Sequence, residues 1–557
     1  MRFHPRDLRN LADPKEQSIR NLRPATACAL IFHHRRNIIL GPKPVRLRAA
    51  RRLTRARVSR SCPLETSNPC AMKLIRIVAL LALFANSSAL GARTNVLLIL
   101  ADDLNDWVGA LTSHPNARTP NIDRLAASGM LFRQAYAASP KCNPSRTALL
   151  LGLAPSTTGI YDNGHWWRPH MPEAITLPEA FRRAGYLVAG GGKIFHHTAG
   201  FNPPDLWDAY FDLRFDDPWD RPGSAYPGIG PARPPPGHPL ASMTPFRHEL
   251  DWGSLPIREA DYGDARTVAW AADFLRQQRA QPFLLAVGLF HPHLPWYAPQ
   301  RFFAAFEAGQ TTLPHAPADD LADVPAEGRR LAGRGADVFA AIRAAGKWAE
   351  AVSAYAASIT FADALVGQLL GALEDSPHSE NTVVVFASDH GFHLGEKQHW
   401  YKSTLWERAT HVPLVIRGPG VAAGSVCDSP VSLLDIYPTL LELAGVPAGS
   451  KLDGHSLAGL LADPDSEPNR HAGITYLHGN HAVRQGRWLY IRYHDGGEEL
   501  YDRDADPHEL ANLADDEELL EVKRALAELL PRKNAAAAPL KSAYVFDPGE
   551  YSWTPRP

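Results

Sequence analysis

The residues whose types could do chemistry begin with Cys142, in the stretch SPKCNPSRTALLLG. Pro144 suits the first position of a helix, Asn143 before it is a good N-cap, and Gly152 is a suitable stop. We therefore expect Cys142 at a helix N-terminus beside Arg146, where free N–H groups and the helix dipole favour an anion. A cysteine with only a packing role would prefer an apolar core, so this position indicates chemistry.

Four apolar segments that are typical of strands each end in polar residues. The segments NVLLIL, YLVAGG, FLLAVGLF and TVVVFAS run into ADD, GKIFHH, HPH and DHGFHLGEKQHWYKS respectively. Because sites in open α/β sheets form outside the carboxyl ends of the strands, these groups should share one edge of a sheet. One such cluster could be coincidence, but four indicate a site.

The polar residues divide into cation ligands and anion-binding groups. Adjacent carboxylates repel, so Asp102 and Asp103 call for a cation, and with Asp389 and His390 they form an oxygen-rich set suited to Ca²⁺ or Mg²⁺. A DD pair alone is equally well explained by a capped, solvated turn, and a single histidine before proline is often only a loop residue, so the joint placement carries the argument. The cations and donors around this set suit sulfate or phosphate, and they are Arg146, Lys193, His196, His291 and Lys402.

The elements that must position these residues form an α/β pattern of short apolar runs alternating with amphipathic stretches. Strands are predicted at 95–100, 186–191, 283–290, 382–388 and 413–418, and helices at 121–129, 172–184, 262–279 and 348–374. Nine prolines in 218–246 indicate an irregular loop, expected at the substrate rim, and 308–346 is poorly patterned. After residue 445, two or three antiparallel strands, a turn and a helix are expected, followed by an extended tail from Pro531.

The first 91 residues have a different character. Residues 1–71 hold sixteen Lys and Arg against four Asp and Glu, whereas 42 stand against 55 from Met72 onward. MKLIRIVALLALFANSSALGA, from Met72, has the basic start, short apolar run and small residues of a secretory signal peptide. We expect Met72 to be the true start and 1–71 to be disordered upstream sequence, with 72–91 as the signal peptide. The alternative is a genuine basic extension with a membrane anchor.

A true start at Met72, followed by a signal peptide, predicts an exported protein, periplasmic or extracellular, with no stable membrane anchor. Three of five cysteines precede Met72, which leaves Cys142 and Cys427 for one bridge at most. If Cys142 is chemically special, Cys427 is a free thiol. The predicted organisation is a catalytic domain at 92–445 and a smaller C-terminal unit at 446–557.

The sequence resembles the type I sulfatases, in which the signature is C-x-P-S-R followed by an apolar helix and glycine. CNPSRTALLLG matches it, and LADD, GKIFH, FHPHLP, SDHGFHLGEK and ELYDRDADPHELANLA extend the resemblance from Asn95 to about Leu513. The GKIFH, HPH and WWRPH stretches are similar to the iduronate-2-sulfatase-like branch. His390, where many sulfatases have Asn, narrows the branch and leaves the metal interpretation intact.

The resemblance implies an alkaline-phosphatase-like α/β sandwich, with a large mixed and mainly parallel sheet and a C-terminal antiparallel subdomain. It implies that a maturation enzyme oxidises Cys142 to Cα-formylglycine, whose hydrate attacks sulfur and later expels sulfate. One Ca²⁺ would be held by Asp102, Asp103, residue 142, Asp389 and His390. The remaining implied roles are sulfate binding by Lys193 and Lys402, orientation by Arg146, leaving-group protonation by His291 or Lys402, and deprotonation by Asp103 and His196.

Three other functions compete with sulfate-ester hydrolysis. A phosphate or phosphonate monoester hydrolase of the same superfamily is the first, although phosphatases of this fold usually use Ser or Thr and two metals. A non-catalytic sugar-binding protein should have lost a core residue, and none is missing. A nucleic-acid-binding arm at 1–71 lacks aromatic residues between the basic ones, so no nucleic acid partner is expected.

The expected substrate is a sulfated carbohydrate, such as a polysaccharide or glycosaminoglycan fragment. Specificity should lie in the 218–246 loop, in DNGHWWRPH and in the segment after Pro295. Trp166, Trp167 and Trp296 could stack on sugar faces, and each alone is as well explained by packing.

Overall fold

The computed structural model describes residues 93–211, 250–306, 311–532 and 534–557. The chain divides into two units, Met1–Leu81 and Ala82–Pro557, and every described residue belongs to the second. The predicted upstream segment 1–71, the signal peptide at 72–91 and the Pro-rich loop at 218–246 lie outside the described residues.

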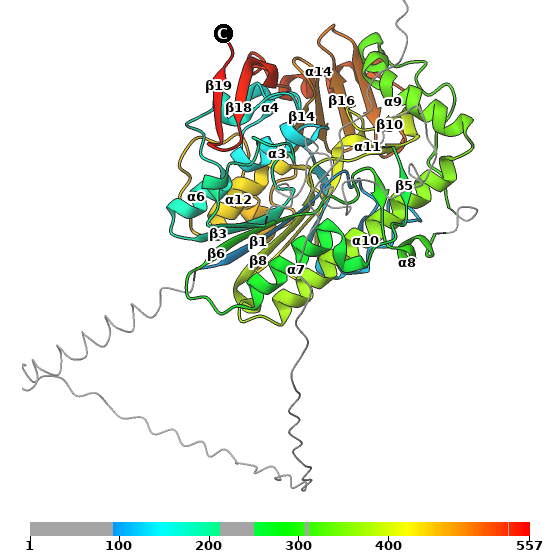
Figure 1. Ribbon diagram of the computed structural model, residues 1–557. Coiled ribbons are helices and arrows are strands. Elements are labelled where there is room, and N and C mark those ends of the chain that lie inside the picture. The colour runs from blue at the N-terminus through cyan, green and yellow to red at the C-terminus, as the bar shows by residue number, and fades with distance from the viewer. Residues whose placement is uncertain (1–92, 212–249, 307–310, 533) are drawn as a thin grey trace, which may run out of the picture. The chain divides into compact units, whose positions relative to one another are not determined.

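A nine-stranded sheet lies at the centre of the second unit (Figure 1). Its strands are β1 (Asn95–Ala101), β2 (Met130–Tyr136), β3 (Leu187–Gly192), β4 (Ala209–Phe211), β6 (Phe283–Gly288), β8 (Thr382–Ser388), β11 (His411–Arg417), β12 (Ser425–Cys427) and β13 (Val431–Ser432). The order is β12-β2-β11-β8-β1-β6-β3-β4, with β13 paired to β2. Only β11 runs antiparallel to its neighbours in this sheet, so the predicted mixed, mainly parallel sheet is confirmed.

Helices cover both faces of the sheet, because successive residues of its buried strands point to opposite sides. In β1, Leu97 and Ile99 join one hydrophobic core, whereas Val96, Leu98 and Leu100 join the other. The first core includes α2 (Pro120–Ala127), α7 (Gly263–Arg276) and α10 (Trp348–Glu374), and the second includes α3 (Cys142–Leu151), α6 (Leu177–Arg183) and α12 (Ile436–Leu443). Figure 1 shows α7 and α10 on one side of the sheet and α3, α6 and α12 on the other.

Helix α10 is the one helix of the described residues that is long and apolar enough to cross a membrane. Within its most apolar window, 72% is buried inside the fold. Val352, Ile359 and Leu369 are among the α10 side chains in the first hydrophobic core. Its apolar character therefore has a sufficient explanation in packing against the sheet and α7.

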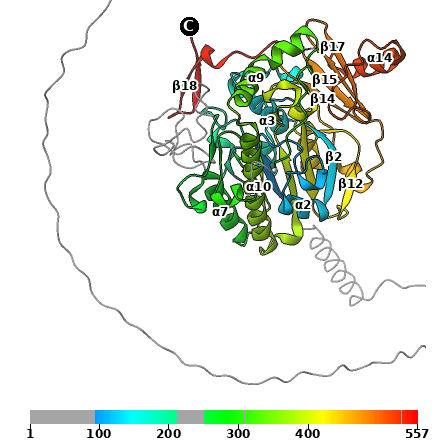
Figure 2. The same cartoon turned by 90° about the vertical axis from the view of Figure 1, so that its right-hand side faces the viewer.

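A second sheet follows the first in sequence and is fully antiparallel. It consists of β14 (His471–Thr475), β15 (His481–Gln485), β16 (Trp488–Arg492) and β17 (Glu498–Asp502), in that order. Val483, Tyr490 and Leu500 pack with Leu526 of α14 (Leu520–Leu529), and Figure 2 shows α14 on the outer side of this sheet. The opposite face, including Leu489, packs with Trp406 and Tyr136 from the central part of the fold.

Two segments differ from the sequence-based expectation. The poorly patterned stretch contains the 19-residue helix α9 (Ala326–Ala344), whose Ala-, Gly- and Arg-rich sequence has few large apolar residues to reveal its period. The tail is not simply extended, because β18 (Tyr544–Asp547) and β19 (Ser552–Pro555) form a hairpin. Aromatic side chains of this hairpin pack on Trp166, which supplies the burial that the tail lacks alone.

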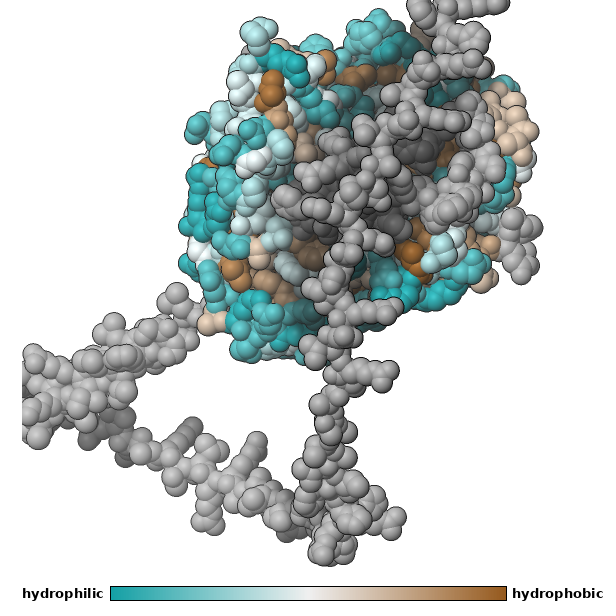
Figure 3. Space-filling model, viewed as in Figure 1, coloured by the Kyte–Doolittle hydropathy of each residue, from teal (hydrophilic) through white to brown (hydrophobic). Residues whose placement is uncertain are grey.

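The remaining α-helices and strands of the described residues are short and lie in the connections between the elements above. They are α4 (Pro155–Thr158), α5 (Trp167–His170), α8 (Gln300–Phe303), α11 (Glu407–Thr410), α13 (Ala458–Ala462), β5 (Trp252–Gly253), β7 (Trp296–Tyr297), β9 (His393–Leu394) and β10 (Trp400–Tyr401). The face drawn in Figure 3 is largely hydrophilic, with apolar residues scattered over it. Leu540 and Val545 of the tail are the most exposed large apolar side chains of the described residues.

Candidate active site

The predicted convergence of strand ends follows from the order of the sheet. Strands β8, β1, β6 and β3 are consecutive parallel neighbours, so their carboxyl ends lie at one edge. Asp102 and Asp103 follow β1, Asp389 and His390 follow β8, and Lys193 follows β3. All five side chains are buried, although four of them, the three aspartates and the lysine, belong to types that are normally exposed. Burying so many charges in one place indicates a functional site.

Helix α3 brings a cysteine to this edge. The helix begins at Cys142 itself, with Lys141 in the extended N-cap position. The prediction of Asn143 as N-cap is wrong, because its amide instead donates to carbonyl oxygens of the 162–165 loop at 2.8–2.9 Å. Gly152 ends the helix as predicted, with a left-handed φ of 65°. The thiol thus lies in the first helical turn, held there by contacts to a neighbouring loop.

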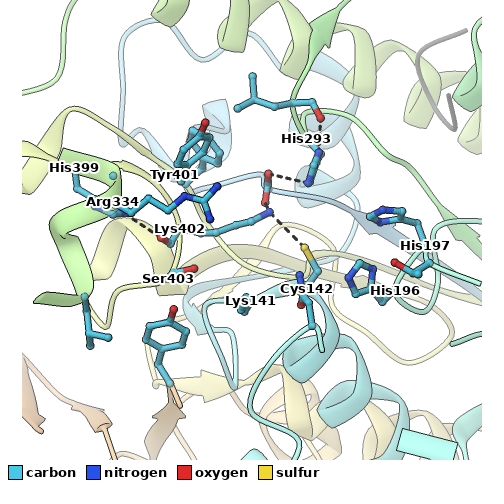
Figure 4. Close-up of a pocket in the computed structure, with 18 residues that line it drawn as sticks. Lys141, Cys142, His196, His197, His293, Arg334, His399, Tyr401, Lys402 and Ser403 are labelled. Atoms are coloured by element: carbon cyan, nitrogen blue, oxygen red, sulfur yellow. Dashed lines mark hydrogen bonds and ion pairs between the residues drawn. The ribbon is translucent and has the colours of Figure 1, made fainter. Parts of the chain in front are cut away.

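Charged and polar atoms surround the sulfur of Cys142 (Figure 4). His390 Nε2 lies 3.3 Å from Sγ, Lys402 Nζ 3.4 Å, Asp102 Oδ1 3.7 Å and Lys193 Nζ 3.8 Å. Burial raises the pKa of the Cys142 thiol, against the opposing effect of the two ammonium groups. A carboxylate, an imidazole and two cations thus meet at one side-chain atom.

The residues predicted to hold a cation lie together. One ligand atom from each of Asp102, Cys142, Asp389 and His390 falls within 4.8 Å of all the others. Asp103 adjoins them, since its Oδ1 is 3.2 Å from His390 Nδ1 and its N–H donates to Asp389 at 3.2 Å. Its φ of 65° is uncommon for a residue other than glycine, and such strain occurs at functional sites. Three buried carboxylates with one imidazole fit a hard divalent cation.

Basic side chains balance these carboxylates. Lys193 forms an ion pair with Asp102, and Lys402 Nζ lies 2.6 Å from Asp103 Oδ1. Burial alone would raise the pKa of Asp102, but Lys193 and the other basic side chains around it hold that pKa well below its usual range. Burial, with the neighbouring Asp102 charge, raises the pKa of Asp103 to about 7 despite Lys402. The two adjacent carboxylates therefore differ in how readily they take up a proton.

Arg146 lies behind the acidic cluster and is fully buried. Its Nε donates to Asp389 at 2.8 Å, one terminal nitrogen donates to the Ala101 carbonyl and lies 3.5 Å from Asp102, and the other donates to the Lys193 carbonyl. Arg146 does not line the cavity in front of Cys142, which differs from its predicted place among the groups that bind sulfate. It fixes the carboxylates from behind, which is a positioning role.

The two histidines of the HPH motif have different surroundings. Both ring nitrogens of His291 are engaged, Nδ1 by Asp264 at 2.6 Å and Nε2 by the Tyr297 carbonyl at 2.8 Å. His291 consequently does not reach the reacting atoms, contrary to its predicted role. His293 does line the cavity, with Nε2 3.8 Å from Asp103 Oδ2. The motif revealed the pair, but only the turn after β6 determines which ring faces the site.

A cavity of about 440 Å³ opens in front of Cys142, with His196, His293 and Lys402 in its wall. His196 is 5% exposed, and its Nδ1 has no hydrogen-bond partner among the described residues. Burial, together with His197 and Lys193, holds the pKa of His196 well below its usual range, so the ring is neutral near pH 7. An unpaired buried nitrogen at a cavity wall is suited to hydrogen-bonding a ligand.

The other histidines of the quoted stretches GKIFHH, DHGFHLGEKQHWYKS and DNGHWWRPH divide between the cavity and the core. His197 and His399 line the cavity, whereas His393 is buried and bonds Thr404 at 2.8 Å. His165 accepts from the Tyr161 N–H, and His170 bonds the Thr158 carbonyl. Arg334, which also lines the cavity, was missed because α9 was not predicted.

The three tryptophans weighed as sugar platforms have packing positions. Trp296 is fully buried beneath the site, and Trp167 is fully buried with its indole N–H on the Phe201 carbonyl. Trp166 is 7% exposed and packs against the C-terminal hairpin. None of the three lines the cavity, so packing explains them.

The fold and the site together define a class of protein. A mixed sheet between helices places buried carboxylates, lysines and a helix-start cysteine at its carboxyl edge, which is the arrangement of an alkaline-phosphatase-like ester hydrolase. The structure of a phosphonate monoester hydrolase from Agrobacterium radiobacter has this fold, with TM-score 0.63 and 23% identity over 78% of this chain and 94% of that one.

Sequence comparison identifies the family within this class. The sulfatase family model matches residues 94–446, and a model for the C-terminal part of N-sulphoglucosamine sulphohydrolase matches 395–536. A sulfatase from Formosa agariphila is 36% identical, over 82% of this chain and 90% of its own. Human iduronate 2-sulfatase is 31% identical, over 63% of this chain and 69% of its own. The chain belongs to the sulfatase family and is a sulfuric ester hydrolase.

Proposed function

We propose that this sulfatase works through a Cα-formylglycine made from Cys142 and one bound Ca²⁺, on a sulfated carbohydrate. Sulfatases generally use formylglycine and a metal ion. The observation that carries the proposal is the position of the CNPSR cysteine, whose Sγ lies among Asp102, Lys193, His390 and Lys402. Asp102, Asp103, Asp389, His390 and residue 142 would hold the ion.

The donor set supports calcium among divalent ions. Carboxylate oxygens dominate it, and calcium takes more oxygen ligands with less rigid geometry than magnesium. When bound, the ion supplies positive charge beside the sulfate oxygens, and the hydrated formylglycine supplies the hydroxyl that attacks sulfur. The chain's own residues provide the remaining functions.

Those residues bind the sulfate and move protons. Lys193 and Lys402, both within 3.8 Å of Sγ, are placed to bind sulfate oxygens. Asp103 is placed to accept a proton from the nucleophile, and His196 to accept one when sulfate leaves. His293 or Lys402 protonates the leaving oxygen, with His293 in the role that the sequence suggested for His291.

The substrate proposal rests on the cavity and on the relatives. A cavity of about 440 Å³ exceeds what a sulfate group occupies and leaves room for the sugar that carries it. One relative is named for iduronate, a sugar acid. The signal-like segment at 72–91 supports export to the periplasm or outside the cell, and the CNPSR motif supports a maturation enzyme as partner.

The test is to express residues 72–557 with and without a formylglycine-generating enzyme and to analyse the tryptic peptide Cys142–Arg146. We expect a peptide lighter than the encoded form and reactive with hydrazide probes, and hydrolysis of an aryl sulfate by the matured protein only. Cys142→Ala should lower kcat by about a thousandfold or more. EGTA should abolish activity and Ca²⁺, unlike Mg²⁺, should restore it.

Other outcomes would contradict the proposal. An active protein with an intact thiol would exclude formylglycine, and restoration by Mg²⁺ alone would exclude calcium. Aryl phosphate and phosphonate substrates, assayed in parallel, test the phosphonate hydrolase alternative. If the aryl phosphate or the phosphonate is turned over faster than the aryl sulfate, the phosphonate hydrolase alternative is favoured.

A further inference from the structure

The cavity in front of Cys142 contains a cation that has no acidic partner among the described residues. Three Lys or Arg side chains line this cavity. Lys402 is paired with Asp103, and Lys141 is paired with Asp162. Arg334, on α9, forms no ion pair and no side-chain hydrogen bond within the part of the chain that the structure describes.

The fold holds Arg334 at the cavity. Figure 4 shows its guanidinium directed into the cavity from the side of His399 and Tyr401, across from His196. Its neighbour Gly335 fixes the distance of α9, since a Cβ there would come within 2.0 Å of the His399 ring and 2.3 Å of the Trp400 carbonyl. The helix therefore packs directly on the segment that leads to Lys402.

Arg334 and the groups at Cys142 would meet different parts of a substrate. The reacting sulfate belongs beside Cys142, where Lys193 and Lys402 compensate its charge. A planar guanidinium binds carboxylate or sulfate through two parallel hydrogen bonds. Arg334 is exposed to solvent at the cavity, so its donors are open to an anionic group of a substrate.

We infer that Arg334 is a specificity residue that binds a second anionic group, a carboxylate or another sulfate, on the sugar that carries the reacting sulfate. This inference rests on the proposed function and adds a requirement to it. A sulfated uronic acid or a disulfated sugar satisfies the requirement, whereas a neutral monosulfated sugar does not. The cavity has the volume for a sugar residue between the two anions.

The test compares Arg334→Gln with the wild type on disaccharides that carry, besides the reacting sulfate, a carboxylate, a second sulfate, or neither. A neutral aryl sulfate serves as the reference. We expect kcat/KM for the substrates with a second anion to fall about 10- to 100-fold, mainly through KM, as for a lost charged hydrogen bond. Hydrolysis of the aryl sulfate should change less than about twofold. Arg334→Lys should retain part of the wild-type preference for substrates with a second anion.

A matched control lies on the same helix. Arg343 is exposed and lies outside the cavity, so Arg343→Gln should leave kcat/KM unchanged for all of these substrates. Binding can be measured without turnover by calorimetry on the Cys142→Ala protein. Adding Arg334→Gln to that protein should weaken its affinity for the disaccharides with a second anion about 10- to 100-fold.

The possible outcomes are distinguishable. A response only to the carboxylate or only to the second sulfate supports the inference and identifies the anion. Equal effects of Arg334→Gln on all substrates, or no effect on any, would overturn it, as would a wild type that does not prefer the doubly anionic sugars. Failure of the matured wild type to hydrolyse the aryl sulfate would instead count against the proposed function.

Discussion

At the scale of single residues, the HPH turn assigns different tasks to two similar side chains. His291 is held by Asp264, which also accepts the N–H groups of Phe290 and His291. His293 faces the cavity beside Asp103. We therefore expect His293→Gln to lower kcat about 10²- to 10⁴-fold, as for loss of an acid–base group, with little change in stability.

His291→Gln should have the opposite profile. Loss of its bond to a buried carboxylate should cost about 1–3 kcal/mol of unfolding free energy, with a smaller change in kcat of the folded protein. Urea unfolding and single-turnover hydrolysis of an aryl sulfate measure the two quantities. A fall in kcat for His291→Gln as large as for His293→Gln, at unchanged stability, would return His291 to the catalytic role.

At the scale of elements, β11 begins with a histidine whose proton should stabilise the fold. His411 Nε2 donates to the Arg133 carbonyl at 2.7 Å, and Nδ1 faces Asp106 at 3.6 Å and Glu407 at 3.8 Å. Burial alone would lower the pKa of His411, but the two carboxylates raise it above 6.5. The folded protein therefore keeps this proton to a higher pH than the unfolded chain does.

It follows that the stabilisation by His411 is complete below the pKa of an unfolded histidine and is lost as the pH rises through the folded-state value. His411→Gln should lose about 1 kcal/mol more unfolding free energy at about pH 6 than at about pH 9. Urea unfolding of both proteins at the two pH values measures this difference. Equal losses of unfolding free energy at both pH values would show that the His411 ring stabilises the fold only through packing.

The elements also show what can be predicted from this sequence. Strands β1, β3, β6 and β8 were predicted because buried parallel strands are continuous apolar runs. Their shared edge followed from topology, which brought Asp102 and Asp389 together. Arg334 was not predictable, because α9 lacks a clear apolar period and nothing local indicates which cavity a helix faces. The predicted start of α3 is wrong because the Asn143 side chain bonds carbonyl groups of the 162–165 loop instead of capping the helix. Nothing in the sequence of α3 itself indicates that loop.

At the scale of the whole molecule, the C-terminal tail reaches back to the site. Ala535 and Ala538 donate N–H groups to the carbonyls of Ser156 and Gly159 at 2.8 and 2.9 Å, and Lys541 donates to Gly164. The same 156–164 segment carries Asp162 and Asn163, which bond the first turn of α3. The last residues of the chain therefore help to hold the residue that carries the chemistry.

Removing the tail should therefore weaken both stability and activity. A protein ending at Arg532 loses these backbone bonds and the aromatic contacts to Trp166, so we expect a lower Tm and a kcat reduced about tenfold, as for a small displacement at a catalytic centre. Gly159→Ala is the finer test, since its φ is 75° and a Cβ would come within 2.2 Å of the Ala536 carbonyl. It should release the tail and give an intermediate loss of kcat. Ala536→Gly, which leaves the backbone contact possible, is the control. Full kcat in the shortened protein at a temperature where it is folded would show that the 156–164 segment holds α3 unaided.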